Sequence, residues 1–342
     1  MRAPMEWLLE SNHFMISEEN VKHCFLFAII PSLLITAAPA FAFPGKTLPA
    51  KAAVVMDDYG TVLYAKFPNA KLAPASTVKL VTAMVALDHL KPDDVVMISW
   101  NASRVKTIPP GICPDEEMTV ADLLHLALMK SINSSAVALA EAAAGSEAAF
   151  TVLMNRKAQE LGARDTLFAN ASGLPKGGNQ YSTASDLALI MKAALSYPLI
   201  REILATKEYT IRTTAGREIF VESSNHLLWQ EQAMIIGKTG YTGNARHCFV
   251  GMMATESGPV FTAVLGARSR TSLWRATSML AEVGAHPELA NLLETRYTKR
   301  GSGKTNVKKS KPSRAGMQQD PIGQDIQISR LLRISSQQLG NN

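Results

Sequence analysis

The residues best suited to nucleophilic chemistry in this sequence are Ser76 and Lys79, which bracket the segment Ser-Thr-Val-Lys. A serine hydroxyl is a poor nucleophile unless a base takes its proton. At a separation of three residues on a helix, the two side chains lie on one face and can touch. In a first helical turn, the helix dipole helps Lys79 to lose its proton. The segment therefore predicts a serine that is activated by a neutral lysine.

Two further motifs follow: Ser131-Ile132-Asn133 after a predicted helix, and Lys238-Thr239-Gly240 in a predicted strand. Singly, these patterns are weak, because Ser-x-Asn also occurs at 99–101 and 223–225, and a second Ser-x-x-Lys spans 103–106. Each residue alone is better explained as a capping serine, a solvated lysine or a turn asparagine. Lys-Thr-Gly occurs once, and the three motifs together, in this order, match a known set for serine acyl transfer.

Other chemistries have little support in the sequence. No two of the seven histidines have the spacing of a metal-binding pair, and no Gly-x-Ser-x-Gly turn is present. Gly301-Ser302-Gly303-Lys304-Thr305 resembles a phosphate-binding loop, but Thr298 replaces the glycine that the motif requires, and no strand precedes it. The sequence therefore predicts neither a metal nor a cofactor.

Helices and strands must bring the three motifs together. Apolar periodicity predicts helices, one beginning at Ser76 and one opened by Thr119, and the later ones at 134–144, 146–161, 183–196 and 271–283. Strands are predicted at both ends of the chain, at 51–57, 61–66, 207–213, 217–222, 233–239, 247–255 and 259–267. Strands at both ends and helices between them predict one α+β domain whose terminal strands meet in an antiparallel sheet.

The two termini differ from this body in composition. The apolar run 25–42 ends in Ala40-Phe41-Ala42, which predicts a signal peptide over 1–42 and export of the protein; a membrane-spanning helix is the alternative. Residues 289–342 have an excess of seven positive charges, so the rest of the chain has a net charge of −1 out of a total of +6. We expect a catalytic domain over 43–288 and a basic, disordered tail over 289–342. The nearly neutral body argues against nucleic-acid binding, while the tail predicts weak contact with an anionic envelope surface.

Cysteine usage agrees with a fold that needs no disulfide framework. After cleavage at Ala42 only Cys113 and Cys248 remain. They could pair with each other outside the cytoplasm, but burial of both thiols is the simpler expectation.

Longer segments around the motifs identify a family. The segments Ala73–Asp88, Asp165–Leu174, Tyr181–Ala188 and Gly237–Thr242 resemble the nucleophile helix, central segment and active-site strand of the low-molecular-mass penicillin-binding proteins, which are serine D-alanyl-D-alanine peptidases. The resemblance extends from about residue 50 to 285. It implies a fold like that of β-lactamases and transpeptidases, with an antiparallel sheet flanked by helices and an inserted helical subdomain.

The resemblance also implies a role for each motif residue. Ser76 would attack the carbonyl between two D-alanines, Lys79 would be the general base, and Ser131 would pass a proton to the leaving amine. Asn133 would hold the amide of a peptidoglycan stem peptide. Lys238 would keep Lys79 neutral and attract the peptide carboxylate, and Thr239 would hydrogen-bond that carboxylate. Gly240 and Tyr241 continue this strand, and the N–H groups of Ser76 and Tyr241 would hold the oxyanion. β-Lactams would be covalent inhibitors, and the location would be the periplasm or envelope of a bacterium.

Four functions compete on this resemblance. Arg268, in Leu-Gly-Ala-Arg, resembles the arginine with which carboxypeptidases grip a terminal carboxylate, and it favours a carboxypeptidase over an endopeptidase that cuts crosslinks. Thr166 stands where a class A β-lactamase has its deacylating glutamate, so slow deacylation is expected. A non-catalytic penicillin-sensing or wall-binding module is the fourth alternative. Arg246 departs from the family, which often has glycine there, and adds charge near the end of the active-site strand.

Overall fold

The structure, a computed structural model, describes residues 47–175, 178–229 and 235–294. The predicted signal peptide (1–42) lies outside these residues, as does the predicted tail beyond 294. The short helices Pro287–Leu289 (η4) and Ala290–Glu294 (α9) show that regular structure extends six residues into the segment expected to be a tail.

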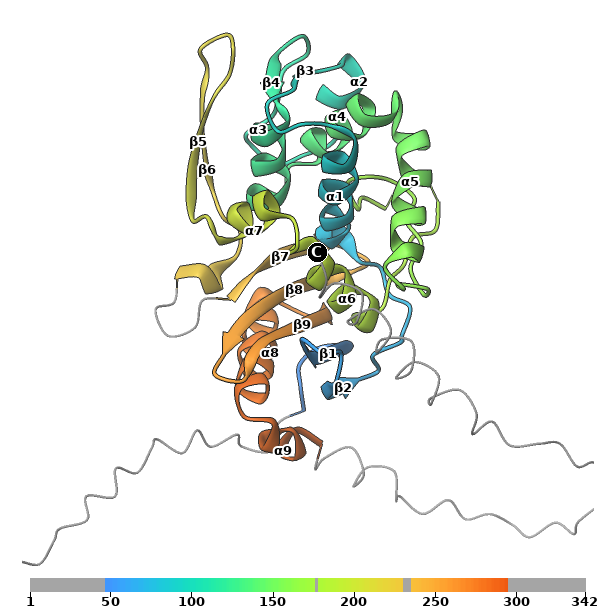
Figure 1. The fold of residues 1–342 in the computed structure, drawn as a ribbon, viewed down its shortest axis with the longest axis vertical. Helices are drawn as coiled ribbons and strands as arrows, with labels where there is room; N and C mark the ends of the chain where they lie inside the picture. Colours follow the sequence, from blue (N-terminus) through green and yellow to red (C-terminus); the bar gives the residue numbers. More distant parts are fainter. Residues whose placement is uncertain (1–46, 176–177, 230–234, 295–342) are drawn as a thin grey trace, which may run out of the picture. The chain divides into compact units, whose positions relative to one another are not determined.

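A five-stranded antiparallel sheet joins the two ends of the described chain (Figure 1). Its strand order is β2-β1-β9-β8-β7, with β1 at Ala52–Asp57, β2 at Val62–Lys66, β7 at Ile235–Thr242, β8 at Arg246–Thr255 and β9 at Gly258–Ala267. The first strand pairs with the last, in the register Ala53 opposite Val264. This confirms the expectation that the terminal strands meet in one sheet, and it leaves β7 at an edge.

Helices cover the sheet because its central strands are apolar on both sides. Successive residues of β1 are buried, although their side chains point alternately to opposite faces. The strands β1, β8 and β9 contact both α6 (Ala184–Ala194) and α8 (Arg270–Ala285). Thr183 caps α6 by accepting from the Asp186 N–H, at the start of the helix that the sequence predicts over 183–196.

A helical subdomain is inserted between β2 and β7. Its centre is α1 (Lys79–His89), which is buried from Lys79 to Ala86 and packs against α4 and α5. The subdomain also contains η1 at Ala75–Val78, β3 at Val95–Met97, α2 at Trp100–Ser103, β4 at Glu117–Thr119, α3 at Val120–His125, the π-helical turn η2 at Leu126–Lys130, α4 at Asn133–Ala144 and α5 at Glu147–Glu160. Thr119 caps α3 by accepting from the N–H of Asp122, which confirms the predicted helix start.

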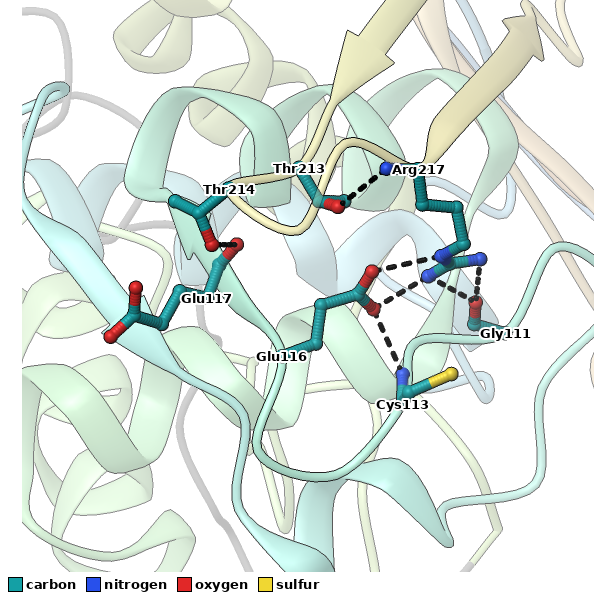
Figure 2. A network of polar contacts seen from close by, with 7 residues as sticks. All are labelled: Gly111, Cys113, Glu116, Glu117, Thr213, Thr214 and Arg217. Atoms are coloured by element: carbon teal, nitrogen blue, oxygen red, sulfur yellow. Dashed lines mark hydrogen bonds and ion pairs between the residues drawn. The ribbon is translucent and has the colours of Figure 1, made fainter.

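The hairpin formed by β5 (Glu208–Arg212) and β6 (Glu218–Glu222) follows α7 (Pro198–Ala205) and leads through η3 (His226–Trp229) to β7. Its tip is attached to the subdomain by a polar network around Glu116 (Figure 2). The guanidinium of Arg217 donates to both carboxylate oxygens of Glu116 and to the carbonyl of Gly111. The Cys113 N–H donates to the same carboxylate at 3.0 Å.

The two cysteines differ in exposure and are not joined. Cys248 is buried, as predicted, whereas Cys113 is exposed on the loop that carries Glu116. The prediction of burial was therefore wrong for Cys113, because this loop lies at the surface of the subdomain. Among the described helices no single one has the length and apolarity to cross a membrane, although α4 and α5, bent by 88° at their junction, pass that test together.

Candidate active site

The predicted nucleophile Ser76 lies in a tight turn at the start of the buried helix. The sequence predicts an α-helix from Ser76, but the first turn, Ala75–Val78, is a 3₁₀-helix, and α1 begins at Lys79. Ala75 has a φ of 51°, which is uncommon for a residue with a side chain. Gly173 packs on this turn so closely that a Cβ there would lie 2.1 Å from the Ala75 carbonyl oxygen. The turn that carries Ser76 is therefore held closely by Gly173.

Lys79 is completely buried and makes three polar contacts. Its Nζ lies 3.0 Å from Ser76 Oγ, 2.7 Å from Asn133 Oδ1 and 2.7 Å from the carbonyl oxygen of Ser172. A neutral amine has two N–H groups and one lone pair. The Asn133 and Ser172 oxygens can only accept, so each takes one of the two N–H groups. The Ser76 hydroxyl can donate to the lone pair, so the three contacts fit the neutral amine.

Electrostatics favour the same neutral form of Lys79. Burial, and next the charge of Lys238, hold the pKa of Lys79 well below its ordinary value. Lys238 is itself completely buried, and burial lowers its pKa to about 7. Its Nζ donates to the Thr239 carbonyl at 3.0 Å. The two lysines therefore lie close enough that the proton on one disfavours the proton on the other.

Ser131 and Asn133 reach the site from the junction of η2 and α4. Ser131 ends the π-helical turn with a φ of 68°, and it lines the pocket beside Ser76. The Asn133 Nδ2 donates to the Lys106 carbonyl at 2.8 Å, while its Oδ1 accepts from Lys79. Asn133, expected to hold substrate, therefore also positions the lysine.

The edge strand β7 forms the opposite wall. A Cβ on Gly240 would lie 3.0 Å from the backbone nitrogen of Ser76, so strand and nucleophile turn are in close contact. Thr239 Oγ1 lies 2.6 Å from Ser224 Oγ. Tyr241 is 57% exposed, with its ring 4.5 Å from that of His247. Among the described strands β7 pairs with β8 alone, so its other edge has no strand partner, which is the kind of edge to which an extended peptide can add.

A cavity of about 460 Å³ opens between these walls. It is lined by the predicted residues Ser76, Ser131, Asn133, Thr239, Gly240 and Tyr241. Lys79 and Lys238 are buried and do not line it. The structure thus brings eight of the nine predicted residues to one place.

Arg268 is the exception, because the structure does not bring it to this cavity. It lines a different cavity, whereas Arg270 lines the catalytic one. The strand β9 ends at Ala267, the chain then bends, and α8 begins at Arg270. The first turn of α8, with Leu273 and Trp274, faces the catalytic cavity. Motif spacing could not distinguish two arginines on either side of this bend.

Sequence reasoning also missed three polar groups of the site. The carbonyls of Ser172 and Lys106 position Lys79 and Asn133, and a backbone group leaves no signal in residue type. Ser224 belongs to the Ser-x-Asn match at 223–225, which seemed incidental, and that match was the available signal. No group of three or more His, Cys, Asp or Glu residues that could hold a metal ion occurs in the described ranges.

Comparison with known proteins gives consistent matches. A family model described as D-alanyl-D-alanine carboxypeptidase matches residues 37–269. The carboxypeptidase DacF of Bacillus subtilis is 35% identical over 252 residues, which cover 70% of this chain and 64% of that protein. A D-alanyl-D-alanine endopeptidase of Escherichia coli is 31% identical over 263 residues, which cover 73% of this chain and 84% of that protein.

Solved structures give the same result for the fold. A D-alanyl-D-alanine carboxypeptidase from Mycobacterium tuberculosis aligns with a TM-score of 0.66 and 32% identity, over 72% of this chain and 94% of the other. A mutant form of a Streptomyces K15 DD-transpeptidase aligns with a TM-score of 0.66 and 27% identity, over 70% of this chain and 98% of the other. The α+β fold expected from the sequence is confirmed.

Proposed function

The chain belongs to the D-alanyl-D-alanine carboxypeptidase family, and on this premise we propose that it removes the terminal D-alanine from peptidoglycan stem peptides through an acyl-enzyme on Ser76. The observation that carries the proposal is the contact of 3.0 Å between Ser76 Oγ and the Nζ of the buried Lys79, whose pKa is held well below its ordinary value by burial and by the charge of Lys238. Only a neutral amine can accept the serine proton. The Bacillus subtilis relative is matched over less than two thirds of its length, so the proposal concerns the part that is matched.

In the acylation step the Ser76 hydroxyl transfers its proton to Lys79 Nζ. The oxygen bonds to the carbonyl carbon of the penultimate D-alanine, and the carbon–nitrogen bond to the terminal D-alanine breaks. Ser131 Oγ donates its proton to the leaving amine and takes up the proton held by Lys79 Nζ, which is then neutral again. The N–H groups of Ser76 and Tyr241 stabilise the oxyanion, which agrees with the close approach of Gly240 to the Ser76 nitrogen. Water then hydrolyses the ester and frees Ser76.

The terminal carboxylate of the substrate would bind at the end of the cavity beyond β7. Thr239 and Ser224 offer hydroxyls there, and Arg270 offers a guanidinium that can form paired hydrogen bonds with a carboxylate. Arg270 therefore takes the role that the sequence assigned to Arg268. The buried Lys238 on β7 would add positive electrostatic potential at the carboxylate.

The test is the intact mass of the protein after incubation with labelled penicillin, with Ser76→Ala alongside. A long-lived adduct on the wild type alone is expected, because slow deacylation follows from Thr166 in place of a deacylating glutamate. Rapid turnover of the drug would indicate a β-lactamase instead. Neither adduct nor turnover would indicate the non-catalytic module.

One observation favours an endopeptidase as the second candidate. The catalytic cavity continues into another of about 460 Å³, and the two share Ile108, Lys130, Ser224 and Arg270. A terminal D-alanine needs little space, so this extension suits a larger leaving group. Release of D-alanine from a free stem peptide, measured beside cleavage of a crosslinked dimer, separates the two activities.

Two proposals concern the ends of the chain. Export through a signal peptide over residues 1–42 is supported by the apolar run and its small-residue end, and it would place the enzyme in the bacterial envelope beside its substrate. Weak contact between the basic tail and anionic envelope surfaces is supported only by the charge excess of residues 289–342.

A further inference from the structure

A second cavity, of about 850 Å³, is lined by several basic residues. Its walls come from residues 47–51, from the end of β2, from the start of β8 and from the bend between β9 and α8. Four of its lining residues are cations, namely Lys51, Lys66, Arg246 and Arg268, and none of the described lining residues is acidic. We call it the basic cavity.

The cations of the basic cavity have no anionic partner within the described chain. None of the four takes part in an ion pair found among those residues. The Lys66 amine donates to the carbonyls of Leu48 and Ala50, both at 2.8 Å, and burial lowers its pKa. Four like charges in one cavity repel each other, so an anion that enters it is attracted by all of them.

The backbone is shaped to bring these charges together. Gly266 has a φ of 72°, and a Cβ there would lie 2.7 Å from Cγ and Cδ of Lys51, so the glycine leaves room for the lysine stem. Arg246 also has a positive φ, of 63°. Because His247 pairs with Ala267, Arg246 and Arg268 lie at adjoining strand ends. Positive φ at a residue with a side chain is unfavourable, so this arrangement has a cost.

The basic cavity and the catalytic cavity are lined by residues that are neighbours along the chain. His247 lines the catalytic cavity, and its neighbour Arg246 lines the basic cavity. In the same way Leu273 faces the first and Ser272 the second. A polymer that carries many stem peptides offers carboxylates to both cavities.

We propose that the basic cavity binds carboxylates of a peptidoglycan stem peptide other than the one being cleaved, and so anchors the enzyme to its polymer. The inference rests on the proposed function, because that function identifies the polymer in the neighbouring cavity. An uncrosslinked stem ends in a free carboxylate, which two arginine forks can bind through paired hydrogen bonds. Phosphate would suit the same cations, but the position beside a peptide-cleaving site favours the carboxylate.

The test is co-sedimentation of the purified full chain with isolated peptidoglycan. The double variant Lys51→Gln with Arg246→Gln keeps the side-chain stems and removes two charges. The matched control, Lys91→Gln with Arg164→Gln, removes two exposed charges that do not line the basic cavity. We expect the first double variant to bind at least about fivefold more weakly than the control at low salt. Equal thermal unfolding midpoints establish that both remain folded.

Amidation of the peptidoglycan carboxylates identifies the ligand. We expect amidation to abolish the difference in peptidoglycan binding between the two double variants. Equal binding of the two to untreated peptidoglycan would overturn the proposal. A difference that survives amidation, or that appears only with phosphatidylglycerol vesicles, would also overturn it and would indicate phosphate. D-Alanine release from a small soluble peptide by the wild type tests the proposed function separately, because it does not involve the polymer.

Discussion

At the scale of single residues, the chemistry depends on the neutrality of Lys79. Two of its contacts are to oxygens that only accept, and the third is to the Ser76 hydroxyl. Burial and the charge of Lys238 both disfavour its protonated form. A lysine whose pKa is lowered in the folded protein is neutral over a wider pH range, so acylation should rise with pH and level off well below the ordinary value of 10.5.

Removing the charge of Lys238 should move this pH dependence. In Lys238→Met the pKa of Lys79 rises, so less of it is neutral, and the rising limb of penicillin acylation moves to higher pH. The effect should be largest below neutral pH, because burial holds the pKa of Lys238 to about 7. Lys130→Met is the control, since it removes a charge from the cavity rim but not from a group that lowers the pKa of Lys79. If the rate of penicillin acylation rose over the same pH range in both variants, this mechanism would be contradicted.

A pair of arginine variants tests how the substrate carboxylate is recognised. Arg270→Ala should lower kcat/KM for a peptide ending in D-Ala-D-Ala by about tenfold, mainly through KM, because an exposed charge-assisted contact is lost. Arg268→Ala should have the smaller effect, because that residue lines the basic cavity. Steady-state kinetics on the two proteins measure both effects. A larger loss of kcat/KM for Arg268→Ala than for Arg270→Ala would favour Arg268 as the residue that binds the carboxylate.

At the scale of the elements, the site depends on the close approach of β7 to the nucleophile turn. Gly240→Ala places a methyl group 3.0 Å from the Ser76 nitrogen and must widen this gap. Since small displacements at a reacting centre cost about 10–100-fold in rate, acylation by penicillin should slow by that factor. Gly243→Ala is the matched control, because a Cβ there meets nothing within 4 Å. Equal acylation rates would exclude a role for the close approach.

The hairpin β5–β6 offers a test of stability. Burial alone would raise the pKa of Glu116, but the hydrogen bonds from Arg217 and Cys113 and the charge of Arg217 outweigh it and lower that pKa. Glu116→Gln should therefore reduce the free energy of unfolding by about 1–3 kcal/mol near neutral pH. The wild-type advantage is fully present above the ordinary glutamate value of 4.5 and is lost as the pH falls through the lowered pKa of the folded protein.

The control for this prediction is the adjacent Glu117→Gln. The two carboxylates differ in their contacts, because Arg217 donates only to that of Glu116 (Figure 2). Thermal unfolding from pH 3 to 7 compares the variants over about the range in which glutamate titrates. Losses of equal size would show that the network contributes nothing specific.

The elements also show what a sequence can and cannot predict here. Side-chain motifs on regular elements, such as Lys238-Thr239 on β7, are found because type and spacing determine their chemistry. The nucleophile turn and the π-helical turn before Ser131 are not found, because their shape comes from tertiary contacts such as Gly173 against Ala75. Arg268, which the sequence placed at the site, lines another cavity for a related reason, since the direction of a bend after a strand is not encoded in local periodicity.

At the scale of the whole molecule, the active site is assembled across the insertion. The helical subdomain supplies Ser76, Lys79 and Ser131, the edge strand β7 supplies Thr239, and the start of α8 supplies Arg270. Parts of the chain that are distant in sequence thus meet at one cavity. The motifs follow each other along the sequence in the order of the elements that carry them.

The pairing of β1 with β9 has a consequence for how the protein is made. Ala53 cannot find its partner Val264 until nearly the whole domain has left the ribosome. Contacts between residues so far apart in sequence form slowly, because a long loop must close first. A nascent chain of this topology therefore lacks its completed sheet until nearly the whole domain has been synthesised. That delay suits the export proposed above, because a chain whose sheet is incomplete can still thread through a narrow translocation pore.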